Sequence, residues 1–153
     1  MLCGTHFLVP SFEAMTRTWR LLLLIVAGFN TLSALAGGIG LMTPGAIGMP
    51  GWWLEGTGFT YPTAGVILLL VVGGTQALAF LLVLLRRPWG YLANAVAGFG
   101  MVLWIYIEVV MLPVYSFLHT IYVTTGIAQL ALTFACLGIL SRTVGASAAS
   151  EGR

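Results

Sequence analysis

Residues 91–112, YLANAVAGFGMVLWIYIEVVML, contain a single charged side chain, the carboxylate of Glu108. An α-helix rises about 1.5 Å per residue, so about 22 residues of this kind cross a hydrocarbon core about 30 Å thick. Glu108 is also the only acidic residue inside any long hydrophobic run of the chain. The stretch therefore predicts a membrane-spanning helix that carries one carboxylate.

Three more runs share the length and apolar character of this stretch. They cover residues 21–42, 64–85 and 118–140. The turn Arg86-Arg87-Pro88 separates the second run from the third, and so short a connection makes the two helices antiparallel neighbours. The predicted fold class is all-α, an integral membrane four-helix bundle over residues 17–142.

Composition supports a lipid-facing surface. Of the 153 residues, 59% are hydrophobic and only 7% are charged, whereas soluble domains carry about 25% charged residues. The mean hydropathy is +1.04. The six basic residues form no dense basic face, which excludes a nucleic-acid partner. The lipid bilayer is the expected partner.

Arginines flank one side of the predicted bundle. They precede the first run, occupy the turn between the second and third, and follow the fourth: Arg17, Arg20, Arg86, Arg87 and Arg142. The other two loops contain no arginine. By the positive-inside rule, these topology-setting residues place both termini and the Arg86-Arg87 turn in the cytoplasm.

The two ends of the chain are expected to be tails. Residues 1–16 predict a cytoplasmic tail, with Met15 as an alternative start, and residues 143–153 predict a disordered cytoplasmic tail. A cleaved signal peptide is the rival interpretation of the first run, because Ala34-Leu35-Ala36 resembles a cleavage site. The apolar character continues past that site, so we expect the segment to be retained as a helix.

Residues 43–60 form a glycine- and proline-rich loop that includes Trp52 and Trp53. Amphipathic rings are favoured in the headgroup layer, so the loop predicts an interfacial anchor. The alternative is a lid over a cavity between the helices, since long loops often carry function.

Three amides fall near the middle of the first, second and fourth runs: Asn30, Gln76 and Gln129. An unpaired amide in hydrocarbon costs several kcal/mol. We therefore expect all three to face inward and to hydrogen-bond one another or a backbone carbonyl. Such amides either hold the bundle together or form the polar floor of a ligand cavity.

Two further polar stripes follow helical spacing. The fourth run carries His119, Tyr122, Gly126, Gln129, Thr133 and Cys136, and the third carries Asn94, Ala97, Met101, Trp104 and Glu108. Both stripes end near the predicted outer surface with an ionisable group, so Glu108 and His119 are candidate partners. The pair is either a proton-linked site or a polar contact that closes the turn between the two helices.

Motifs for autonomous catalysis are absent from the sequence. It contains no H-E-x-x-H, P-loop, G-x-S-x-G or paired-thiol motif. One glutamate and one histidine are too few for a metal site, and a bis-histidine haem needs two buried histidines. We therefore expect no catalytic residue, no metal and no cofactor.

The runs PTAGVILLLVVGG (62–74) and WIYIEVVMLPVYSFLHTIYVTTG (104–126) resemble those of small four-span bacterial membrane proteins, and in size and topology the chain resembles the broad DoxX-like group. The resemblance implies a multi-pass bundle in the bacterial cytoplasmic membrane and transfers no catalytic residue.

Two functions fit these features. The first is an accessory or interaction subunit of a larger membrane complex or a homo-oligomer. The second is a binder or transporter of a small hydrophobic molecule, a lipid or a quinone. Its cavity would be lined by Asn30, Gln76, Glu108 and Gln129.

Overall fold

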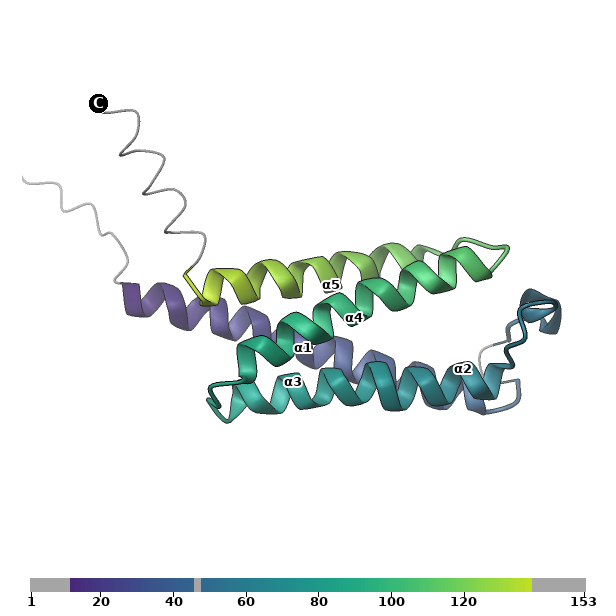
Figure 1. Ribbon diagram of the computed structural model, residues 1–153, viewed down its shortest axis with the longest axis horizontal. Coiled ribbons are helices and arrows are strands. Elements are labelled where there is room, and N and C mark those ends of the chain that lie inside the picture. The colour runs from purple at the N-terminus through teal and green to yellow at the C-terminus, as the bar shows by residue number, and fades with distance from the viewer. Residues whose placement is uncertain (1–11, 46–47, 139–153) are drawn as a thin grey trace, which may run out of the picture.

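A computed structural model describes residues 12–45 and 48–138, and within them every regular element is helical. The described helices make four long spans, and Figure 1 shows their arrangement. The first is α1 (Phe12–Met42), and the second is built from α2 (Tyr61–Ile67), the π-helical segment η2 (Leu68–Gly73) and α3 (Gly74–Leu84). The third and fourth are α4 (Gly90–Met111) and α5 (Phe117–Cys136). All four are long and apolar enough to cross a membrane.

All four predicted helices are present, and two of their ends differ from the prediction by more than three residues. The first helix begins at Phe12 rather than Leu21, because no glycine or proline interrupts residues 12–20. The described part of α5 ends at Cys136, before the predicted Leu140. Gly138 follows with a φ of 68°, and a left-handed glycine just past a helix ends it. Residues 1–11 and 139–153, with most of both predicted tails, lie outside the described part of the chain.

Local sequence explains the other helix boundaries. The side chain of Thr60 accepts the backbone N–H of Thr63 at the start of α2, which supplies a partner for an otherwise unpaired helical donor. At the C-terminal end of α4, Leu112 is extended (φ −90°, ψ 135°). It precedes Pro113, and proline disfavours a helical conformation in the residue before it. These signals place the loops of the bundle.

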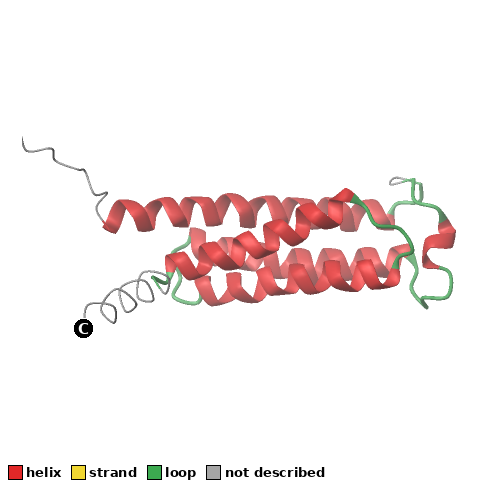
Figure 2. Cartoon of the chain, turned by 90° about the horizontal axis from the view of Figure 1, so that it is seen from above, coloured by secondary structure: helices red, strands yellow, loops and turns green. Residues whose placement is uncertain are grey.

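The helices run along one long axis, as Figure 2 shows. The loop between α1 and α2 lies at one end of this axis, and the turn between α3 and α4 lies at the other. The first helix packs against α2, η2, α3 and α5, while α4 packs against α3 and α5. The loop carries a short 3-10 helix, η1 (Gly51–Leu54).

Two pairs of glycines let helix backbones approach closely. A Cβ atom added at Gly65 would lie 2.7 Å from the carbonyl oxygen of Gly38, where η2 and α2 meet α1. A Cβ atom added at Gly126 would lie 3.2 Å from the carbonyl oxygen of Gly98, where α5 meets α4. Helices in lipid associate through close packing rather than hydrophobic force, so these crossings help to hold the bundle together.

The π-helical segment changes which residues of the second span face α1. Gly65 and Gly73 both lie against α1, although a regular α-helix would turn them about 80° apart over this separation. The wider i→i+5 turn of η2 removes that difference. The insertion therefore extends the contact between the first two spans.

Candidate functional site

One side-chain amide from each of the four spans meets in the centre of the bundle. Asn30 comes from α1, Gln76 from α3, Asn94 from α4 and Gln129 from α5. All four side chains belong to residues with 0% exposure. In such surroundings an amide without partners is costly, so the hydrogen bonds among these four groups decide how stable the arrangement is.

Gln129 is the centre of this amide network. Its Oε1 accepts a hydrogen bond from Asn30 Nδ2 at 2.9 Å. Its Nε2 donates to Gln76 Oε1 at 3.0 Å and to Asn94 Oδ1 at 2.9 Å. Gln129 thus uses both amide protons and its oxygen, and it connects α5 to the three other spans.

Backbone carbonyls complete most of the remaining bonding capacity. Asn94 Nδ2 donates to the carbonyl oxygens of Ala79 and Gly90, each at 2.9 Å. Gln76 Nε2 donates to the carbonyl oxygen of Ala97 at 3.0 Å. The exception is Asn30 Oδ1, which is buried and has no hydrogen-bond partner among the described residues. The network is therefore open at its α1 end only.

The expectation that the three central amides face inward and hydrogen-bond is met. Asn94, which the sequence placed on a separate stripe, joins them because the short turn between α3 and α4 brings it against Ala79. Whether the four amides also bind a ligand stays a prediction. Two surface pockets on the described part of the chain are lined by other residues and by none of these four.

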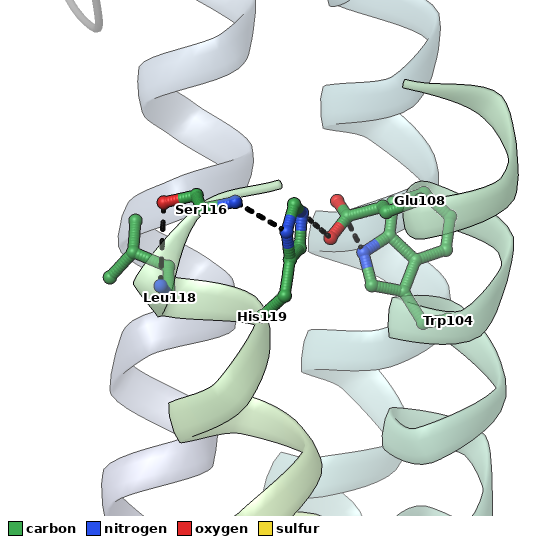
Figure 3. Close-up of polar contacts among 5 residues, drawn as sticks. All are labelled: Trp104, Glu108, Ser116, Leu118 and His119. Atoms are coloured by element: carbon green, nitrogen blue, oxygen red, sulfur yellow. Dashed lines mark hydrogen bonds and ion pairs between the residues drawn. The ribbon is translucent and has the colours of Figure 1, made fainter. Parts of the chain in front are cut away.

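Glu108 and His119 lie together near the turn between α4 and α5, as Figure 3 shows. Trp104 Nε1 donates to Glu108 Oε1 at 2.8 Å, which fixes the carboxylate. Glu108 Oε2 is 3.8 Å from His119 Nε2, close enough for electrostatic contact but too far for a direct hydrogen bond. The structure therefore places the two candidate partners side by side.

His119 also caps its own helix. The backbone N–H of Ser116 donates to His119 Nδ1 at 3.0 Å, and the N–H of Leu118 donates to Ser116 Oγ at 3.3 Å. This is a capping box with histidine in the place usually taken by Glu or Gln. Because Nδ1 accepts, the neutral ring carries its proton on Nε2, directed toward Glu108.

The two polar groups are separate sites. Glu108 lies about three turns beyond Ala97 on α4, which is about 16 Å along the axis. Of the four residues predicted to line one cavity, the structure brings Asn30, Gln76 and Gln129 together and leaves Glu108 apart. Tyr122 lies between the two sites, where its ring stacks on that of Phe29 at 6.3 Å.

The tryptophans of the loop between α1 and α2 contact each other. Their ring centroids are 6.2 Å apart in an edge-to-face arrangement, and Trp52 is 55% exposed. The hydroxyl of Tyr61 donates to the carbonyl oxygen of Pro50 at 2.6 Å, which ties the loop to the start of α2. An exposed indole here fits the predicted interfacial anchor, and the lid stays a prediction.

The arginine end of the bundle contains a contact that the sequence did not indicate. Arg20 on α1 donates from Nη2 to the carbonyl oxygens of Val83 and Leu84, at 3.0 and 3.2 Å. It thereby satisfies carbonyls at the end of α3, where a positive charge is also favourable. Arg17, Arg86 and Arg87 are exposed, and Arg142 lies outside the described residues.

Within residues 12–45 and 48–138, no group of three or more His, Cys, Asp or Glu side chains could hold a metal ion. Comparison with protein-family models, with curated proteins and with solved structures finds no match to this chain. The comparisons therefore identify no family. The protein is a four-helix protein whose four spans are long and apolar enough to cross a membrane.

Proposed function

We propose that the chain is an accessory subunit of a membrane complex, a four-span module that acts through its outer surfaces. In this proposal the arginine end faces the cytoplasm of a bacterial cell, and the loop with Trp52 rests at the opposite membrane surface. The distribution of arginines and exposed aromatic rings supports this orientation.

The state of the buried amides carries the proposal. An interior site for a substrate needs polar groups that are free to meet it. Here Gln129 uses both amide protons and its oxygen in hydrogen bonds with other side chains, and Asn94 donates both amide protons to backbone carbonyls. The centre of the bundle is built to hold four helices together, which leaves the outer surfaces for interaction.

An interior cavity for a lipid or a quinone remains the second candidate. The one observation in its favour is Asn30 Oδ1, the buried acceptor without a partner among the described residues. A ligand that donates a hydrogen bond to this atom would complete the network. The separation of Glu108 from the amides weighs against a cavity that includes all four predicted lining residues.

Purification of the full chain from its native membrane in mild detergent tests the proposal. We expect a stoichiometric protein partner, or a defined homo-oligomer, in native mass spectrometry and in chemical cross-linking. An isolated monomer that retains a neutral apolar molecule, and loses it in Asn30→Leu, would overturn the proposal in favour of the cavity. Leu32→Ile, a substitution at an exposed position of α1, is the matched control for nonspecific loss of ligand.

We assign the pair of Glu108 and His119 a structural role at the turn between α4 and α5. The capping bond from Ser116 to His119 supports this role, because it ties the imidazole to the helix start. Glu108→Gln keeps an oxygen that can accept from Trp104, so we expect the variant to fold. A pH response of the wild type that disappears in Glu108→Gln would establish the proton-linked alternative instead.

A further inference from the structure

A groove runs along the outer surface between α3 and α4, on the side facing away from the amide network. Its volume is about 240 Å³. Thr75 and Leu78 line it from α3, while Trp89, Leu92, Ala93 and Val96 line it from the start of α4 and its first turns. The hydroxyl of Thr75 donates to the carbonyl oxygens of Val71 and Val72, so the surface that the groove presents is apolar.

Two glycines lie next to this groove, toward the middle of the bundle. Gly74 lies four residues before Leu78, and Gly100 lies four residues after Val96, so helical spacing puts each on the groove side of its helix. A Cβ atom added at either glycine would meet no other atom within 4 Å. No internal packing contact therefore requires the absence of a side chain at these two positions.

The distance from the inner end of the groove to the arginine turn matches the depth of one membrane leaflet. From Thr75 to Arg86 the second span rises about 16 Å, against about 15 Å for half of a hydrocarbon core. Trp89, which is 68% exposed, stands at the end of the groove next to the turn, where indole rings favour the headgroup layer. The groove and the turn beyond it thus extend together from the centre of the hydrocarbon to the interface.

The turn that closes the groove is positively charged. Arg86 and Arg87 are both exposed, and no side-chain hydrogen bond is recorded for either among the described residues. Arg20 and Arg17 lie at the same end. The acidic residues with described side chains, Glu55 and Glu108, belong to the opposite end of the bundle. Among the side chains that the structure describes, the arginines of the turn thus have no carboxylate partner at this end.

We infer that this groove binds an anionic phospholipid, with one acyl chain between α3 and α4 and the phosphate at Arg86 and Arg87. An apolar channel one leaflet deep fits an acyl chain, and guanidinium groups bind phosphate oxygens through charge-assisted hydrogen bonds. Basic sites between membrane helices are recognised as headgroup sites. This site is independent of the accessory role, because it needs no protein partner.

Native mass spectrometry of the full chain in detergent tests the site, with phosphatidylglycerol and phosphatidylcholine of identical acyl chains as probes. Each arginine near a headgroup contributes about a fivefold preference for the anionic lipid, so two give about 25-fold. The double variant Arg86→Gly/Arg87→Gln should remove this preference. Arg86 occupies a left-handed position with a φ of 55°, which glycine adopts without strain, so the turn should still form.

Matched controls separate this site from general effects. Arg17→Gln removes an exposed arginine at the same end but outside the groove, and the lipid preference should survive it. Val96→Trp fills the groove and should weaken retention of both lipids. Val110→Trp places the same bulk on the same helix, at a valine that is 66% exposed near the other end, and should leave retention unchanged.

Three results would overturn the inference. The lipid preference could persist in Arg86→Gly/Arg87→Gln, or fall equally in Arg17→Gln, which would indicate a diffuse field rather than a site. Val96→Trp could leave lipid retention unchanged while it dissociates an oligomer or a protein partner. That outcome would make the groove a docking surface for a transmembrane helix.

Discussion

Replacement of Gln129 with methionine should destabilise the bundle by about 5 kcal/mol. Methionine matches the length of the side chain but lacks the amide, so three hydrogen bonds between helices are lost. Bonds of this kind contribute about 0.6 kcal/mol each in membrane proteins. The larger cost is that Asn30 Nδ2, Gln76 Oε1 and Asn94 Oδ1 become buried groups that lack this partner, at about 1 kcal/mol each by the low end of measured penalties.

Asn30→Leu provides the contrast within the same network. It also leaves one group without its partner, Gln129 Oε1, and it also loses one hydrogen bond. However, it removes Asn30 Oδ1, which has no partner among the described residues and already carries a desolvation cost. Gain and loss nearly cancel, so the expected change in the free energy of unfolding lies within about 1 kcal/mol of zero.

Unfolding in mixed micelles, titrated with sodium dodecyl sulfate and followed by circular dichroism, measures both variants. Two-state fits give the free energies of unfolding, and size-exclusion chromatography verifies that each variant starts as the same species. The reasoning is refuted if Asn30→Leu costs as much as Gln129→Met. In that case the hub position of Gln129 would not determine the energy of the network.

Three other predictions use the same unfolding assay or nuclear magnetic resonance. Gly38→Ala should lower the free energy of unfolding by about 2 kcal/mol or more, because its Cβ would lie 2.9 Å from a backbone oxygen of α2. Gly74→Ala has open space around the added Cβ and should be neutral or stabilising. Equal costs for the two variants would contradict the packing argument. Arg20→Met should cost about 1–2 kcal/mol by removing both hydrogen bonds to the end of α3, and an unchanged stability would show that water replaces the guanidinium. Nitrogen chemical shifts of neutral His119 should show the Nε2–H tautomer, and a proton on Nδ1 would exclude the capping bond.

The number and depth of the spans could be predicted because both depend on local properties of the sequence. Membrane helices need about 20 apolar residues in a row, and each of the three connections between them contains a proline. The same counting put Asn30, Gln76 and Gln129 at similar depth. Residue counting does not show which amide is the centre of the hydrogen-bond network. The side-chain hydrogen bonds of Gln129 depend on how the three other helices are rotated about their axes.

Contacts distant in sequence or unusual in type escaped prediction. The sequence marks Arg20 only as a topology signal, and its bonds to Val83 and Leu84 join residues more than sixty positions apart. The capping box at Ser116 had a local signal, a serine three residues before a possible acceptor, but histidine stands where Glu or Gln is expected. The separation of Glu108 from the amides could have been found by converting residue counts into distances along α4.

The π-helical segment makes the second span one residue longer than a regular α-helix with the same contacts. A π-bulge is a single surplus residue accommodated by one wide turn. Deletion of one residue within 68–73 would restore regular α-helical geometry in the second span. The turns on both sides of the deletion, at Gly65 and Gly73, would still face α1. This segment is therefore the place in the four spans where natural variation in chain length can occur without rotating Gln76 out of the core.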